Sequence, residues 1–161
     1  MKKSLFILVV AASMLLGFNN SQAGNNPAES VTQSGTSTVK LTKAMFLEKV
    51  WDYESSPKEW KYKGDKPALI DFYADWCGPC RTAAPILEEV AEEMKDQLTI
   101  YKIDTQVERE LAGVFGVSGI PAFLYIPMEG RPTMTSGIAR TKEDTKKMFT
   151  ENINKLLLAK K

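Results

Sequence analysis

Two cysteines, Cys77 and Cys80, are the side chains whose type and spacing suit chemistry most directly. They are the chain's only cysteines and lie in the run Trp76-Cys77-Gly78-Pro79-Cys80. Two intervening residues put the second sulfur about one helical turn from the first, close enough for the pair to form a disulfide. One sulfur of such a pair can attack a foreign disulfide, and the other can then release the product. The pattern therefore predicts a redox-active dithiol.

The surrounding residues predict that this run follows a buried strand and opens a helix. A thiolate at a helix N-terminus faces free backbone N–H groups and the positive end of the helix dipole. We expect Cys77 at the exposed tip as the nucleophile and Cys80 inside the helix as the resolving thiol. The alternative is a structural disulfide. So short a loop would stabilise the fold by only about 1.9 kcal/mol, against about 4.7 kcal/mol for a 100-residue loop, which favours the catalytic interpretation.

Asp71 is a second candidate because it interrupts the apolar run Ala-Leu-Ile-Asp-Phe-Tyr-Ala at 68–74. A buried carboxylate is costly, and burial raises its pKa. Six residues before Cys77, it can reach the underside of the helix start and exchange a proton with Cys80, directly or through water. The alternative is a carboxylate bonded to backbone at the end of the sheet. Ile120-Pro121, which opens a further strand pattern, is a third candidate, although proline there is ordinary and cis X–Pro bonds are uncommon.

Composition excludes several other kinds of site. The chain has 161 residues, enough for one domain, with a formal net charge of +1 and no histidine. Lacking histidine, it has no Ser-His-Asp or Cys-His site and no His-ligated metal. Removing residues 1–23 would take away Lys2 and Lys3 and leave a net charge of −1. So small a charge gives no long-range attraction to nucleic acid or an anionic membrane. We predict no metal, no nucleic-acid partner and no cofactor beyond the Cys77–Cys80 disulfide.

The N-terminus has the pattern of a secretory signal peptide over residues 1–23. Lys2 and Lys3 precede an apolar run, and Ser21-Gln22-Ala23 is a small-x-small cleavage site. A membrane anchor is the alternative, but 5–18 would span only about 21 Å of a roughly 30 Å hydrocarbon core. Residues 24–38 are polar and are interpreted as a flexible leader. The sequence thus predicts a folded domain over 39–161, located in the periplasm or otherwise outside the cytoplasm after cleavage near Ala23.

Hydrophobic spacing predicts the element order βαβαβαββα, beginning near Val39. Strands are expected at 68–74, 98–103, 122–126 and 133–136. Helices are expected at 43–53, at about 80–94, after a capping box Thr105-x-x-Glu108, and after a second box Thr141-x-x-Asp144. Right-handed crossovers then give an α/β fold, a central mixed sheet with helices on both faces. The loop 54–66 carries Trp60 and Tyr62, which either bind a partner or pin the loop to the body.

With these residues in place, the chain resembles a thioredoxin from about Val39 to Leu158. The motifs are Asp71-Phe72-Tyr73-Ala74-Asp75-Trp76-Cys77-Gly78-Pro79-Cys80-Arg81, Pro85, Ile103-Asp104, Gly119-Ile120-Pro121 and Gly137. The resemblance implies a thioredoxin fold, a kink at Pro85 and a cis peptide before Pro121. It also implies that the Ile120 backbone pairs with a substrate strand, a mode of binding that recognises the substrate through its main chain. An apolar docking surface would be completed by Trp76, Gly78, Pro79, Gly137 and Ile138.

The chain also departs from that family. Thioredoxins often carry a lysine near the buried aspartate, at a position that aligns with Ile100, whereas here Lys102 lies on the same strand face. Loop 54–66 is longer than in the simplest members, and the signal peptide is foreign to cytosolic ones. The role of Lys102 stays open at this point.

The predicted export and the active-site motif suggest opposite directions of electron flow. An oxidising compartment suggests a disulfide oxidase, whereas Gly78-Pro79 between the cysteines and Ile120 before the proline match the reducing type. We favour a protein-disulfide reductase that contributes to redox homeostasis. It would act as a monomer on disulfide-containing proteins and be recharged by a membrane electron donor of the thiol-transfer type. Alternatives are an oxidase or isomerase, a reductase for cytochrome c maturation, or a non-catalytic binding module. The maturation reductases usually carry an acidic residue where this chain has Thr82-Ala83-Ala84.

Overall fold

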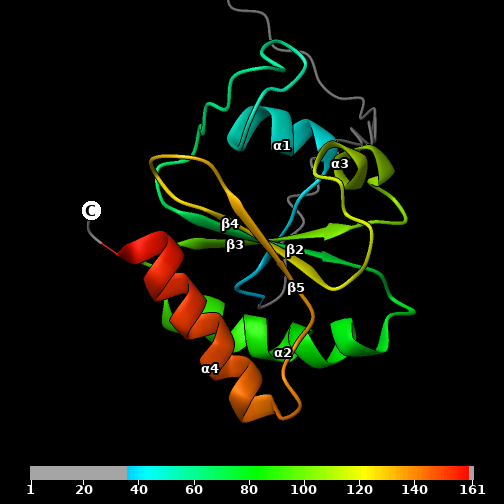
Figure 1. The fold of residues 1–161 in the computed structure, drawn as a ribbon, viewed down its shortest axis with the longest axis vertical. Helices are drawn as coiled ribbons and strands as arrows, with labels where there is room; N and C mark the ends of the chain where they lie inside the picture. Colours follow the sequence, from blue (N-terminus) through cyan, green and yellow to red (C-terminus); the bar gives the residue numbers. More distant parts are fainter. Residues whose placement is uncertain (1–35, 160–161) are drawn as a thin grey trace, which may run out of the picture. The chain divides into compact units, whose positions relative to one another are not determined.

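The computed structural model describes residues 36–159, which form one five-stranded sheet with helices on both faces (Figure 1). The strand order is β1-β3-β2-β4-β5. Strands β1, β3 and β2 are parallel, whereas β4 is antiparallel to β2 and β5 is antiparallel to β4. The predicted α/β fold with a mixed central sheet is confirmed, and β2 lies at its centre.

The elements follow the predicted order. The strands are β1 (Val39–Lys40), β2 (Ala68–Tyr73), β3 (Thr99–Asp104), β4 (Ala122–Ile126) and β5 (Thr133–Ser136). The helices are α1 (Lys43–Lys49), α2 (Gly78–Glu93), α3 (Arg109–Val114) and α4 (Lys142–Ile153), and a π-helical turn, Asn154–Leu158, extends α4. Pro85 lies inside α2.

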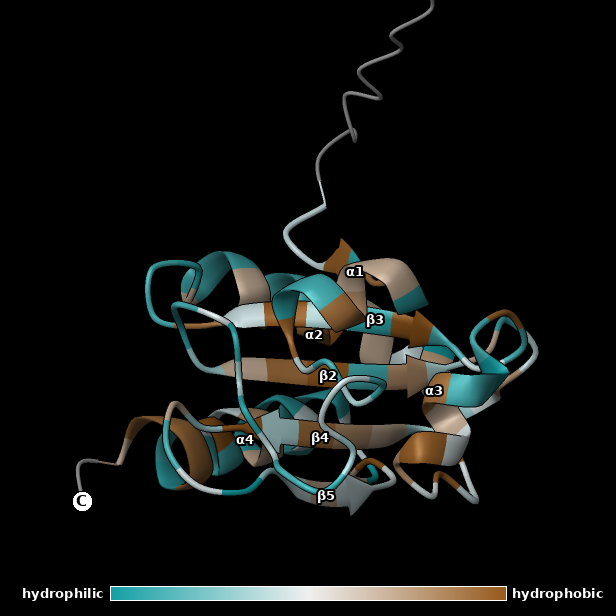
Figure 2. Ribbon diagram, turned by 90° about the horizontal axis from the view of Figure 1, so that it is seen from above, coloured by the Kyte–Doolittle hydropathy of each residue, from teal (hydrophilic) through white to brown (hydrophobic). Residues whose placement is uncertain are grey.

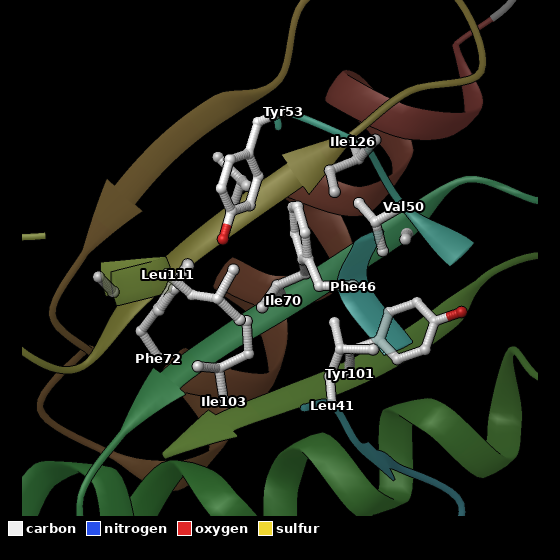
Figure 3. Close-up of a cluster of buried hydrophobic side chains, with 13 residues drawn as sticks. Leu41, Phe46, Val50, Tyr53, Ile70, Phe72, Tyr101, Ile103, Leu111 and Ile126 are labelled. Atoms are coloured by element: carbon white, nitrogen blue, oxygen red, sulfur yellow. The ribbon is translucent and has the colours of Figure 1, made fainter. Parts of the chain in front are cut away.

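The strict alternation of β-strand side chains divides the core into two halves. Ile70 and Phe72 of β2 face α1 and α3, in the cluster shown in Figure 3. Leu69 faces the opposite way, into the cluster beneath α2 and α4. Figure 2 shows the hydrophobic colours along β2 and β4 and paler ones on the edge strand β5. Because β2 is covered on both faces, Asp71 on this strand is buried as well.

Two predicted helix boundaries are wrong. The first helix ends at Lys49 rather than at residue 53, because the carbonyl of Val50 accepts a hydrogen bond from the Lys63 amide at 3.0 Å. The capping box Thr105-x-x-Glu108 does not form. The Thr105 hydroxyl donates instead to the carbonyl of Tyr73, at 3.0 Å, and α3 begins at Arg109 with no side-chain cap. The second box is confirmed, because the Thr141 hydroxyl accepts from the Asp144 amide at 3.0 Å.

The aromatic residues of the long loop pack onto the domain. Trp60 packs against the α1-side core with its ring 5.1 Å from that of Trp51, and the Trp51 indole donates to the carbonyl of Glu59 at 2.9 Å. The hydroxyl of Tyr62 donates to the carbonyl of Lys66 at 2.6 Å. These contacts support the interpretation that the aromatics pin the loop to the body.

The start of the described chain is held against α2. The amides of Ser37 and Thr38 both donate to the Glu88 carboxylate, and Thr38 is buried. Contacts to the domain therefore begin within the segment assigned from sequence to the leader. The predicted signal peptide, residues 1–23, lies outside the described residues. Among residues 36–159 there is no helix long and apolar enough to span a membrane.

Candidate active site

Cys77 stands at the junction where the central strand turns into a helix. Strand β2 ends at Tyr73, and the Cys77 amide donates to the carbonyl of Ala74 at 3.1 Å, which closes the turn. Cys77 is the N-cap of α2, and its Sγ accepts the amide of Cys80 at 3.2 Å. Pro79 fits the first turn because no helical partner exists there for its missing N–H. The sulfur therefore takes the place of the usual capping oxygen, facing the positive end of the dipole.

The two sulfurs are bonded to each other in this structure. Cys77 and Cys80 form a disulfide of 2.03 Å with Cα atoms 5.2 Å apart. The expectation that Cys77 is exposed and Cys80 covered is wrong for this oxidised state, because the two residues are only 3% and 2% exposed. In this state the two cysteines are covered to nearly the same extent. What distinguishes the two cysteines is position, at the N-cap and inside the helix.

Asp71 lies beneath the start of α2. It is 1% exposed and shares its face of β2 with Leu69, which belongs to the core beneath α2. Neither carboxyl oxygen has a hydrogen-bond partner among the described residues. Asp71 and Cys80 line the same cavity of about 260 Å³. The structure thus brings Asp71 to Cys80 as the six-residue spacing predicts, with room between them for water.

Lys102 is the cation that the strand register places opposite this carboxyl. Parallel pairing sets Asp71 opposite Lys102 on β3, and Lys102 lines the same cavity. Ile100, which aligns with the family's usual lysine, pairs with Leu69 instead and is buried in the core. The Lys102 ammonium lies 5.1 Å from the centre of the Tyr73 ring, a cation–π distance. Burial raises the pKa of Asp71 to about 7, and the charge of Lys102 opposes that rise in part.

The predicted docking residues lie at the same edge of the sheet. Strand β4 starts beside the end of β2, since Ala122 pairs with Phe72, and this places Pro121 at the Cys77 end. The Gly137 amide donates to the Pro121 carbonyl at 3.0 Å, which joins the two loops. Gly137 has φ +78°, a conformation that side chains with a Cβ rarely adopt. The peptide bond between Ile120 and Pro121 is cis.

The exposure of these residues suits contact with another molecule. Trp76 is 68% exposed, Gly78 and Pro79 are exposed, and Ile120 and Ile138 are half-buried. Large aromatic side chains are rarely left so accessible on a monomer's surface. Accessible groups therefore lie at the Cys77 end of the sheet, and their role in docking a substrate stays a prediction.

Sequence reasoning missed two groups at the site. Tyr73 lines the cavity and lies beside Lys102, and its position two residues after Asp71 on one strand is a signal that puts both on one face. Arg81 also lines the cavity, and its guanidinium donates to the carbonyl of Asp75 at 3.0 Å. Nothing in the local pattern predicts that bond. Within residues 36–159 no cluster of three or more His, Cys, Asp or Glu is placed to hold a metal ion.

Comparison with known proteins gives one answer. The family model described as Thioredoxin matches residues 37–151. A thioredoxin from Borreliella burgdorferi is 41% identical over 99 residues, covering 62% of this chain and 84% of the relative. One from Alicyclobacillus acidocaldarius is 39% identical over 95 residues, covering 59% and 78%. The crystal structure of chloroplastic thioredoxin z superposes with a TM-score of 0.54 at 25% identity, covering 71% of this chain and 92% of the other.

The raised pKa of Asp71 predicts a specific pH dependence of stability. An unfolded aspartate titrates near pH 4, so between about pH 4 and 7 the folded chain keeps a proton that the unfolded chain releases. Stability contributed by this proton is complete below pH 4 and is lost as the pH rises through 7. Asp71→Asn cannot ionise. We therefore expect its free energy of unfolding, relative to that of the wild type, to rise by roughly 3 kcal/mol from pH 4.5 to pH 8.

The measurement is urea unfolding of both proteins at the two pH values. Asp75→Asn is the matched control, because it removes an exposed carboxylate four residues away. A stability difference between Asp71→Asn and the wild type that stays the same at both pH values would contradict a buried carboxyl with a raised pKa.

Proposed function

Since the chain belongs to the thioredoxin family, we propose that it works outside the cytoplasm as a reductase of protein disulfides, with Cys77 as nucleophile. Family membership and the Cys77–Cys80 disulfide identify a thiol–disulfide oxidoreductase of the thioredoxin type. The observation that carries the mechanism is the Cys77 sulfur at the N-cap of α2, accepting an amide hydrogen bond. The compartment, the order of the steps and the electron donor are the proposed parts.

The first step is attack by the reduced Cys77 thiolate on a substrate disulfide. The substrate's S–S bond breaks, one of its sulfurs leaves as a thiolate and takes up a proton, and the other is bonded to Cys77. The α2 N-terminus supports this step because its amide hydrogen bond and dipole stabilise the thiolate before attack.

The second step releases the substrate. Cys80 gives its proton to the Asp71 carboxylate, directly or through water in the shared cavity, and attacks the Cys77 sulfur. The mixed disulfide breaks, the substrate's second sulfur leaves as a thiolate, and the Cys77–Cys80 disulfide remains. Two electrons have passed to the substrate. A carboxyl whose pKa is raised to about 7 suits this role, because near neutral pH it can both accept and return a proton.

Substrate docking uses the apolar edge around the disulfide. Trp76, Gly78, Pro79 and the loops of Ile120 and Gly137 would surround the substrate's cysteine. The backbone of Ile120, just before β4, would pair with the substrate chain as an added strand. Pairing through main chain lets one protein act on many sequences, which fits a general reductase.

The direction of electron flow is proposed from Gly78-Pro79 and Ile120. Both match the reducing members of the family, and the histidine that oxidases of this superfamily usually carry between their cysteines is missing from this chain. A reductase in an oxidising compartment must be recharged after each cycle. We propose that a membrane electron donor of the thiol-transfer type reduces the Cys77–Cys80 disulfide and that the protein acts as a monomer.

Replacing the resolving cysteine tests the mechanism. In Cys80→Ser the mixed disulfide on Cys77 cannot be resolved within the molecule, so we expect insulin reduction with dithiothreitol as electron source to fall by about a hundredfold or more. Mass spectrometry should find substrate peptides bonded to Cys77. The matched control, Cys77→Ser, also keeps one thiol but should trap nothing. Full turnover by Cys80→Ser would refute the two-step exchange and favour a binding module.

The reduction potential tests the direction. We expect equilibration with glutathione to give a potential near the thioredoxin value of about −270 mV. A histidine between the cysteines is usual in the oxidases, so Pro79→His should raise the potential, whereas Pro85→Ala, further along α2, serves as the control. A wild-type potential above about −180 mV would contradict the reductase assignment and favour an oxidase or isomerase.

Export is tested by the mature N-terminus. We expect the protein expressed in its native host to lack residues 1–23, to begin at Gly24, and to be released with the extracytoplasmic fraction. Ala23→Arg should block processing because the cleavage site requires a small residue. A chain that keeps Met1 and stays in the cytoplasmic fraction would refute the proposed localisation while leaving the thiol chemistry intact.

A further inference from the structure

The exposed apolar side chains of the described residues are few. Four large ones are exposed among residues 36–159, namely Trp76, Val107, Val114 and Met128. Trp76 and Val107 are the most accessible, at 68% and 66%. A single exposed valine needs no explanation by itself. The position of Val107 and the rigidity of its backbone are what distinguish it.

Val107 follows β3 at the same edge of the sheet at which Trp76 follows β2. Strands β2 and β3 are parallel, and their last residues, Tyr73 and Asp104, pair with each other. Just beyond that pair, both the amide and the hydroxyl of Thr105 donate to the carbonyl of Tyr73, at 2.9 and 3.0 Å. Trp76 follows Tyr73 by three residues and Val107 follows Thr105 by two. Both residues thus lie within three positions of the hydrogen bonds that join β2 and β3 at the Cys77 end of the sheet.

The turn that carries Val107 is held by Asp104. The buried Asp104 carboxylate accepts the amide of Gln106 at 2.9 Å. Its carbonyl accepts the amides of Val107 and Glu108, at 3.2 and 2.8 Å. Because this backbone is fixed before any partner arrives, contact with Val107 costs little ordering entropy. A rigid, exposed aliphatic group beside a catalytic surface has the properties of a docking contact.

We propose that Val107 extends the substrate-docking surface of this enzyme across the β3–α3 turn, where it binds an apolar side chain of the substrate polypeptide beside the reactive disulfide. A substrate polypeptide is the occupant because Val107 lies at the same edge of the sheet as Trp76, which belongs to the docking surface proposed above around Cys77. Val107 acts by positioning the substrate chain and takes no part in the sulfur exchange. The proposal rests on the disulfide exchange at Cys77 and Cys80, and it adds selectivity for proteins with apolar residues flanking the cystine.

Two substrates of different size separate docking from chemistry. Insulin offers a polypeptide around its disulfides, whereas hydroxyethyl disulfide has no atoms that reach beyond the Cys77 surroundings. With Val107→Ser we expect kcat/KM for insulin to fall by about three- to tenfold, chiefly through KM, because apolar burial is lost from the docked complex. On hydroxyethyl disulfide kcat/KM should equal that of the wild type. Val107→Ile keeps an aliphatic surface and should retain wild-type activity on insulin.

Met128→Ser is the matched control. Met128 is also an exposed apolar residue, but it follows Ile126, which pairs with Ala68 at the end of β2 remote from Cys77. Its removal should leave both substrates unaffected. If Val107→Ser changes insulin reduction no more than Met128→Ser does, or slows both substrates equally, the docking role is refuted. If the wild type reduces neither substrate, it is the proposed disulfide exchange that fails.

Discussion

The hydrogen bond from the Cys80 amide to the Cys77 sulfur is the interaction on which the site depends. It exists because β2 ends at Tyr73 and α2 begins at Gly78, so the intervening turn leaves Cys77 as the helix cap. The same geometry puts the sulfur at the positive end of the dipole, sets Cys80 within bonding distance and leaves Trp76 outside the fold. In the proposed mechanism, this one strand-to-helix junction supplies the nucleophile, its partner and the centre of the docking surface.

Burying Asp71 on the central strand costs stability, and the proposed proton exchange with Cys80 is the chemistry that this carboxyl would serve. An apolar side chain would suit that position better, since both carboxyl oxygens lie buried without hydrogen-bond partners among the described residues. The charge of Lys102, which the register sets opposite Asp71, partly opposes the rise in pKa that burial causes, while the cation lies 5.1 Å from the centre of the Tyr73 ring. A carboxyl in a neutral pocket would hold its proton too tightly to act as a base, and one in a close ion pair would not bind a proton near neutral pH.

The hydrophobic spacing of the sequence predicted those features of the structure that depend on residues close together along the chain. The spacing of six residues between Asp71 and Cys77 placed this carboxyl beneath the start of the helix, and the apolar spacing within 80–94 placed the buried face of α2. What it could not predict depends mostly on partners distant in sequence. Thr105 looks like a helix cap, but its hydroxyl bonds to Tyr73, 32 residues away, once β2 and β3 pair. Lys102 rather than Ile100 faces Asp71 because register is a property of two strands together.

Thiol acidity alone does not make an efficient reductase. Lowering a thiol pKa from about 8.5 to about 7 raises its thiolate fraction at pH 7 roughly sixteen-fold, but the weaker nucleophile loses roughly five-fold, for a net gain of about three-fold. Most of the rate must therefore come from holding the substrate disulfide in line with Cys77 and the second thiol in reach. A rigid apolar edge built from Trp76, the Gly137 loop and the Asp104-fixed turn is suited to the first task, and the helix to the second. In the proposed mechanism, the apolar rim is as much a part of the catalyst as the sulfurs.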